Sequence, residues 1–366
     1  MRPLRSSRAT FALLGAIMIS AADVAHAQTG LATEGALFLL LPVGARSVGM
    51  GQAVVADRPG TEAVWWNPAA IGAATHREAA IHHSQSVAGT GDAVTILVPS
   101  SLLGVLALSV NIFDYGEQQS NPDPTAPEEA AGTIIPRSFV YAATYATSLG
   151  SYVTAGLTYK LIQFRIDCTG PCPDINFSAT TSALDLGAQF TVKRSIPLVI
   201  GVAARNIVGL KVQVNDSPQA DPIPRRLQVG LQYRYDVPDK IASETAVRFA
   251  FDLADGIHVG NPAPRFGMDI AFRERFHVRG GYAVEASQSE AGGPSIGLGL
   301  STGNLVFDVG RLLTGLSADA GKAPTYLSLR YLFCKHARRR WPPSRPSHYR
   351  SLTPLGNESR SRACFR

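Results

Sequence analysis

The chain has 366 residues and a formal net charge of +6. The positive charge lies at its two ends, because residues 335–366 carry a net +8 and residues 1–27 a net +2, which leaves −4 on residues 28–334. The main body is therefore mildly acidic, and its charge does not support a nucleic-acid partner.

Residues 1–27 have the pattern of a secretory signal peptide. Three arginines in the first eight residues precede an apolar run from Phe11 to Ala22, and Ala25-His26-Ala27 forms an Ala-x-Ala cleavage site. The apolar run is too short for a membrane-spanning helix, and no later run is long enough. We therefore expect cleavage after Ala27 and an exported protein that is either soluble or a β-barrel.

Residues 28–77 are interpreted as an N-terminal plug or hatch segment. The stretch from Leu37 to Ile71 is apolar and glycine-rich, and it does not alternate. Glycine permits close backbone packing, and Asn67-Pro68 is a signal for a turn or a helix start. A plug that seals a lumen is one interpretation, and a hatch that grips a ligand is the other. The candidate residues are Arg46, Gly49, Met50, Gly51, Trp65, Trp66, Asn67, Pro68 and Ala69.

From residue 78 to residue 333, apolar and polar residues alternate with a period of two. Between Arg226 and Tyr235 the even positions are polar or glycine, and the odd positions are Leu, Val or Tyr. In a strand these two sets lie on opposite faces. The pattern predicts fourteen strands, near Glu78–Ser86, Asp92–Pro99, Gly104–Gln118, Ile135–Ser148, Ser151–Asp167, Ser178–Val192, Pro197–Gln213, Asp221–Val237, Ser243–Gly256, Ala263–Arg273, Phe276–Ala286, Gly293–Ser301, Asn304–Leu313 and Ala323–Phe333.

These strands fit a transmembrane barrel better than a soluble β-sandwich. An even strand number, with tight turns alternating with long loops such as Glu117–Thr133 and Asp167–Phe177, is typical of outer-membrane barrels. Tyrosines near strand ends are expected in an interfacial girdle, and they are Tyr233, Tyr235, Tyr282, Tyr326 and Tyr331. We predict an all-β fold, a transmembrane antiparallel β-barrel of about 14 strands at residues 78–333, in contact with outer-membrane lipid and with the plug in its lumen.

Charged residues of both signs fall on the polar face. They can pair across neighbouring strands inside a closed barrel or form a ladder for a substrate, and pairing is the favoured interpretation. The predicted lumen-facing charges are Lys160, Asp185, Arg205, Arg226, Arg234, Arg248, Asp252, Asp269, Arg273, Arg279, Asp308 and Arg330.

The sequence gives little sign of catalysis or of a metal. Cys168 and Cys172 lie in one predicted loop, and in an exported protein this favours a disulfide over a zinc site. His82 and His83 are adjacent on a strand and point to opposite faces, so they do not suit one metal ion. Because no base, nucleophile and orienting group come together, we predict no enzyme activity, no cofactor and no metal.

Residues 334–366 form a basic tail without alternation. Their Arg, Pro and Ser content predicts disorder. The abrupt change of composition at Cys334 favours an error in the gene model over a tail that binds acidic partners.

The plug motifs resemble those of a known family. Gly44-Ala-Arg46-Ser-Val-Gly49-Met-Gly51 and Trp66-Asn67-Pro68-Ala69 are similar to the N-terminal signature of the PorV/PorQ family, within the FadL-like group of fourteen-stranded barrels. The resemblance extends from Leu37 to Phe333, and the basic tail departs from the family pattern. It implies that Asn67-Pro68-Ala69 lies on a hatch inside the lumen.

The resemblance implies two functions. PorV-like proteins act in type IX secretion, which implies a shuttle that binds secreted cargo proteins and secretion-system components through its extracellular loops. FadL-like relatives move hydrophobic molecules, which implies transport of apolar small molecules across the outer membrane. The motifs do not distinguish between these functions. We rank type IX secretion first, apolar transport second and a purely structural envelope barrel third.

Mass spectrometry of the mature protein tests both predicted ends. We expect an N-terminal peptide that begins at Gln28 and no C-terminal peptide that contains Phe365. Detection of the Phe365 peptide would rule out the gene-model error.

Overall fold

The computed structural model describes the barrel and the segment inside it. The residues that it describes are 35–86, 88–100, 102–120, 132–170, 177–193, 196–209, 212–213, 220–256, 262–284, 292–313 and 323–333. The predicted signal peptide and the predicted basic tail lie outside these residues.

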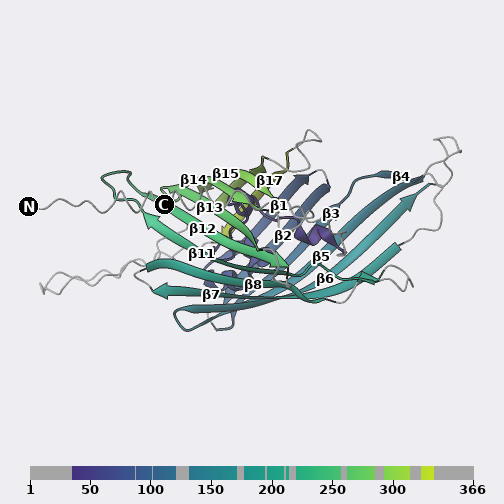
Figure 1. Ribbon diagram of the computed structural model, residues 1–366, viewed down its shortest axis with the longest axis horizontal. Coiled ribbons are helices and arrows are strands. Elements are labelled where there is room, and N and C mark those ends of the chain that lie inside the picture. Colours follow the sequence, from purple (N-terminus) through teal and green to yellow (C-terminus); the bar gives the residue numbers. More distant parts are fainter. Residues whose placement is uncertain are drawn as a thin grey trace, which may run out of the picture. The chain divides into compact units, whose positions relative to one another are not determined.

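Among the described residues, fourteen long antiparallel strands close into a barrel (Figure 1). Strand β1 pairs with both β2 and β17, and β3 pairs with β5, so the ring has no open edge. Each strand matches one predicted segment, so the barrel is confirmed and the sandwich is wrong. The strands are β1 (Arg77–Ser86), β2 (Gly89–Ser100), β3 (Gly104–Asp114), β5 (Gly132–Leu149), β6 (Val153–Thr169), β7 (Phe177–Lys193), β8 (Ile196–Gly209), β11 (Arg226–Asp236), β12 (Thr245–Gly256), β13 (Ala263–Phe272), β14 (Phe276–Ala283), β15 (Gly293–Thr302), β16 (Leu305–Leu312) and β17 (Thr325–Phe333).

The two ends of the barrel differ in their connections. At the turn end, β13 joins β14 through residues 273–275, and β15 joins β16 through residues 303–304. At the opposite end, the loop end, β1 joins β2 through residues 87–88, and the other connections are longer. This end also carries the short strands β4 (Gln118–Ser120), β9 (Val212–Gln213) and β10 (Ala220–Asp221). In outer-membrane barrels short turns face the periplasm and long loops face the exterior.

Alternation of exposure along each strand gives the barrel an apolar outer face. Leu108 and Leu298 are 68% and 62% exposed, whereas inward-facing Asp185 and Asp308 are fully buried. Tyr233, Tyr235, Tyr282 and Tyr331 are exposed on the outer face, but Tyr326 is buried inside. The girdle assignment of Tyr326 is therefore wrong, because its position in the alternation places it inside the barrel.

The plug consists of short helical turns that follow the inner wall. Helix α2 contacts β14 to β17, η2 contacts β1 and β2, and η3 contacts β5 to β7. Its elements are η1 (Leu37–Leu40), α2 (Ala45–Gly49), η2 (Gly60–Glu62), α3 (Ala63–Trp66) and η3 (Pro68–Ala73). No helix in the described part of the chain is long and apolar enough to cross a membrane.

The plug backbone lies against glycines of the barrel wall, which we call the glycine belt. A Cβ atom added to any of these glycines would contact a plug residue; on β16 that residue is Ala45, and on β6 it is Pro68. The belt comprises Gly156, Gly187, Gly201, Gly267, Gly281, Gly297 and Gly310 on seven different strands.

The strand register brings the belt glycines together. Gly156 lies opposite Gly187, Gly267 opposite Gly281, and Gly297 opposite Gly310. Each pair leaves a patch of wall without side chains, where the plug backbone can pass at van der Waals distance.

The substitution Gly281→Ala tests the glycine belt. Its Cβ would overlap the backbone of Met50 and Gly51, so we expect a loss of stability of about 1–3 kcal/mol, typical of overpacking. The measurement is the urea midpoint of unfolding in detergent, followed by heat-modifiable gel mobility.

The neighbouring Gly280→Ala is a matched control. A Cβ at Gly280 meets nothing within 4 Å, so we expect its midpoint to stay within error of the wild type. Equal midpoints for both variants would contradict the belt.

Candidate functional site in the plugged lumen

Arg46 and Asp57 form a buried ion pair within the plug. Arg46 donates from Nε to Oδ2 at 3.0 Å and from Nη2 to Oδ2 at 2.8 Å and Oδ1 at 3.1 Å. Gln232 of β11 also donates to Asp57, at 2.7 Å. Arg46 lies 3.8 Å from Asp269 of β13, so this pair joins the plug to the barrel wall.

Both members of the pair are held in their charged forms. Burial alone would raise the pKa of Asp57, but the charge of Arg46 and hydrogen bonds from Gln232 and Arg46 outweigh burial and lower it. Burial alone would lower the pKa of Arg46, but the charges of Asp57 and Asp269 outweigh burial and raise it. Opposite charges in a low-dielectric site therefore stabilise each other.

A chain of ion pairs continues around the wall. Asp269 accepts from Arg248 at 2.9 Å and lies 3.4 Å from Arg279. Arg279 donates to Asp308 at 2.7 Å, and Arg330 donates to the same carboxylate at 3.2 Å. The predicted pairing of charges across strands is thus confirmed for these five residues.

Arg273 departs from the prediction of a lumen-facing charge. It lies in the turn after β13 with φ of 53°, and its side chain is 57% exposed and paired with Glu244 at 3.2 Å. The alternation that placed it inside the barrel ends with β13 at Phe272.

The Asn67-Pro68-Ala69 motif has a structural role in the plug. The Asn67 side chain accepts a hydrogen bond from the Ala69 backbone at 3.1 Å and so caps η3, which Pro68 begins. Its amide donates to the carbonyl oxygens of Val55 at 2.6 Å and Ala188 at 3.3 Å. The asparagine therefore ties two plug segments to β7.

The other candidate residues contact different strands of the barrel wall. Gly49, Met50 and Gly51 lie against the belt glycines of β13, β14 and β15. The guanidinium of Arg205 lies 5.2 Å from the ring centroid of Trp66 and donates to the Trp65 carbonyl at 3.3 Å. The predicted residues thus contact the barrel at separate places along the plug, and their role in ligand binding stays a prediction.

Sequence reasoning missed two acidic residues of the plug, Asp57 and Glu62. Both are buried, and Glu62 accepts from the Ser47 hydroxyl at 2.7 Å and from its backbone at 3.0 Å. Burial raises the pKa of Glu62 above its ordinary value. The sequence could have identified both residues, because an acidic side chain buried in an apolar segment needs a hydrogen-bond or charged partner.

Apolar side chains gather in the lumen toward the loop end. Phe38 of η1 lies between Phe113 of β3 and Phe164 of β6, with ring centroids 6.4 and 5.5 Å away. Val140 and Ile162 are buried in the same cluster. We call these five residues the aromatic cluster, and sequence reasoning gave Phe38 no separate role.

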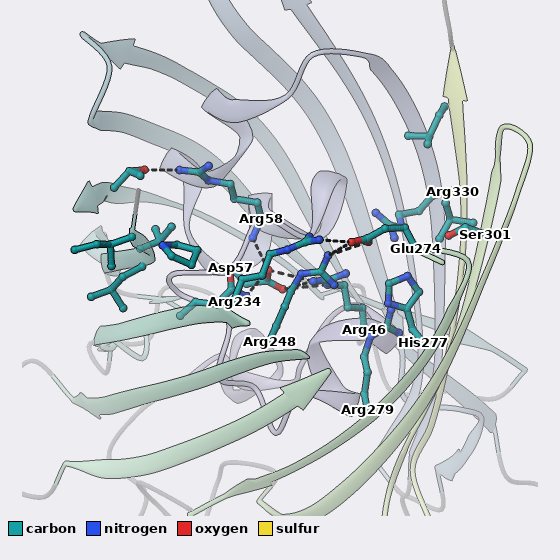
Figure 2. A pocket seen from close by; sticks show the side chains of 18 residues that line it. Arg46, Asp57, Arg58, Arg234, Arg248, Glu274, His277, Arg279, Ser301 and Arg330 are labelled. Carbon is teal, nitrogen blue, oxygen red and sulfur yellow. Dashed lines mark hydrogen bonds and ion pairs between the residues drawn. The ribbon is translucent and has the colours of Figure 1, made fainter. Parts of the chain in front are cut away.

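A cavity of about 540 Å³ lies at the turn end of the lumen (Figure 2). Arginines dominate its labelled lining, and Arg234 and Arg248 both reach Glu274. The arginines that line it are Arg46, Arg58, Arg234, Arg248, Arg279 and Arg330.

The structure describes only one of the two cysteines of the predicted loop disulfide. Cys168 is disulfide-bonded, and Cys172 lies outside the described residues, so this pairing stays a prediction. The described residues contain no group of three or more metal-ligating side chains.

Asp57→Asn tests the plug ion pair. Removing one charge of a buried pair leaves Arg46 poorly compensated, so we expect a loss of about 3 kcal/mol at pH 7, measured by urea unfolding in detergent. Because the pKa of Asp57 is lowered in the folded protein, its contribution is present above the ordinary value of 3.8 and is lost as the pH falls below it.

The stability difference between the wild type and Asp57→Asn should therefore shrink below pH 4. Asp167→Asn is the control, because Asp167 pairs with Arg165 at the surface and should contribute at most about 1 kcal/mol. A pH-independent difference would contradict the assigned role of the carboxylate.

Comparisons with known proteins agree with the barrel fold. No family model matches the sequence, and no curated protein matches it. The toluene transporter TbuX of Ralstonia pickettii is similar, with a TM-score of 0.51 and 13% identity over 81% of this chain and 99% of that one. The toluene transporter TodX of Pseudomonas putida is similar with a TM-score of 0.52 and 11% identity over 80% of this chain and 99% of that one.

At such identities the similarity shows the fold alone. The resemblance to the PorV/PorQ family stays a prediction from the N-terminal motifs. The chain thus has the fold of these transporter barrels.

Proposed function

We propose that this chain is an outer-membrane channel for apolar small molecules, closed by its N-terminal plug. The observation that carries the proposal is the aromatic cluster inside the lumen. Inward positions of such barrels are ordinarily polar, yet here Phe113, Val140 and Ile162 are at most 4% exposed and face the interior. An apolar lining toward the loop end stabilises a bound apolar molecule, because binding there removes its surface from water.

Phe38 enters the cluster from residues 35–43, the part of the plug with the fewest hydrogen bonds to the rest of the chain. Among the described residues, the backbone of residues 35–43 makes one hydrogen bond to the barrel, from Gly35 to the Pro222 carbonyl at 2.9 Å. The later part of the plug is held by the glycine belt and by the Arg46–Asp57 pair. Displacement of η1 therefore costs less than displacement of the whole plug.

Entry of a ligand requires this displacement. Two gaps beside Phe38 have volumes of about 10 and 20 Å³, whereas small-molecule sites measure about 300–1,000 Å³. In the proposed mechanism an apolar molecule replaces Phe38 between Phe113 and Phe164, and η1 moves away from the barrel wall. The similarity in fold to toluene transporters supports an apolar substrate.

Type IX secretion remains the second candidate. It rests on the PorV/PorQ resemblance of Gly44–Gly51 and Trp66–Ala69. The loops that would bind cargo, Glu117–Thr133 and Asp167–Phe177, lie largely outside the described residues. This function predicts that exported proteins co-purify with the barrel, whereas the channel function predicts uptake without them.

Phe38→Ala tests the channel. Loss of the ring leaves an apolar cavity, and such cavities stay dry and accept small aromatic molecules. We expect toluene to bind the variant at least several-fold more tightly than the wild type, measured by the fluorescence of Trp65 and Trp66, which line one of the gaps. Cells that express the wild type should take up labelled toluene faster than cells without the barrel.

Phe249→Ala is the matched control, because Phe249 is 47% exposed on the outer face of β12. It should leave binding and uptake unchanged. If neither the wild type nor Phe38→Ala raised uptake, and exported proteins co-purified with both, the channel function would be wrong and the secretion function would take its place.

A further inference from the structure

The first and last strands of the barrel, β1 and β17, form a pair that we call the seam. They are antiparallel neighbours, with His82 opposite Ser328 in the register (Figure 1). These two residues are 246 positions apart in the sequence, whereas a hairpin pair such as β13 and β14 is joined through residues 273–275. The entropy cost of closing a loop rises with its length, so the seam has the largest such cost among the described strand pairs.

The plug contacts both strands of the seam through different segments. In η2, Thr61 donates to the Glu78 carboxylate of β1 from its backbone at 2.9 Å and from its hydroxyl at 2.7 Å. At the start of α2, the Ala45 backbone donates to the Ser328 hydroxyl of β17 at 2.9 Å. All four residues are buried. The plug therefore bridges the first and last strands of the barrel.

Buried groups also join these two plug segments to each other. Ser47 of α2 donates to Glu62 of η2 from its hydroxyl at 2.7 Å and from its backbone at 3.0 Å. Arg330 of β17 adds a second contact, because it donates to the Pro59 carbonyl beside η2 at 3.0 Å. A continuous set of hydrogen bonds thus runs from β17 through α2 and η2 to β1. Each buried group in it would lack a partner if either seam strand were absent, which is costly.

The chain itself holds the plug close to β1. Helix η3 ends at Ala73 and β1 begins at Arg77, so residues 74–76 connect the plug to the first strand. So short a connection gives η2 a high effective concentration at β1. Helix α2 contacts β14 to β17. A plug docked on β1 therefore presents α2 as a binding surface for the last strands.

We propose that the plug has a second function as an intramolecular template for barrel closure, in which η2 holds β1 while α2 binds β17 and aligns it with β1. The template adds contacts with several strands, and these offset the entropy cost before the seam hydrogen bonds are complete. It also selects the register, because a slip of one residue would turn Ser328 to the outer face and away from Ala45. This function concerns assembly and does not depend on the proposed channel function.

Refolding of the full chain from urea into detergent micelles tests the template. Heat-modifiable gel mobility measures the closed barrel as a function of time. We expect Ser47→Ala and Thr61→Val, combined in one chain, to slow closure at least about fivefold and to raise the unfolding rate less than about twofold. The reason is that contacts already formed in the transition state change the folding rate, whereas contacts formed later change the unfolding rate.

Asn67→Ala is the matched control within the plug. Asn67 anchors the plug to Ala188 of β7, away from the seam. This variant should keep the closure rate within about twofold of the wild type and should unfold faster. Wild-type closure in the chain with Ser47→Ala and Thr61→Val, or equal slowing in Asn67→Ala, would overturn the proposal.

An insertion tests the template while the contacts between plug and barrel stay in place. About thirty Gly and Ser residues inserted after Thr75, which is exposed between η3 and β1, lower the effective concentration of the plug at β1. We expect closure to slow about fourfold, while the unfolding rate stays within error of the wild type. Closure of this chain at the wild-type rate would reject the template, whatever the two side-chain substitutions do to stability.

Discussion

The close approach of the plug backbone to the barrel wall is the constraint on which the rest of this structure depends. A closed barrel of this size has room for its inward side chains or for a segment of chain, but not for both at the same level. The glycine belt resolves the conflict, because it removes side chains from the wall where Ala45, Gly49, Met50 and Pro68 pass. The plug can then fill the lumen at ordinary packing density.

The buried charges fix the position of the plug. Ion pairs inside a protein lose hydration, so their net contribution to stability is small, but breaking one is costly. Arg46 reaches both Asp57 of the plug and Asp269 of the wall. A shifted plug would leave several charges without partners, and this penalty opposes other placements. The charges at this level of the lumen therefore serve the plug, which argues against a ladder for a passing substrate.

The two ends of the plugged lumen have different chemistry. Toward the loop end Phe38 packs on aromatic rings, and the segment around it has few hydrogen bonds to the barrel. Toward the turn end the cavity has an arginine surface opposite an apolar wall. The proposed channel uses the first of these regions. Between them the belt-anchored part of the plug separates the two compartments.

The sequence by itself determined the strands and their sidedness. Alternation with a period of two is a local property of the chain, so Leu231 could be placed outside and Gln228 inside without knowledge of any neighbour. The rule failed for Arg273, which lies beyond the end of β13. For Tyr326 the alternation indicates the inward position that the structure shows, and only the girdle assignment from residue type was wrong.

Only the tertiary structure decided which inward residues meet. Gly267 faces Gly281, and Phe38 reaches Phe164, because the strand register and the path of the plug bring together residues distant in the sequence. Register is set by hydrogen bonds between strands and by the packing of a whole face, and neither is a local property of the sequence. The sequence thus determined which side of the wall each residue occupies, whereas folding determined its partners.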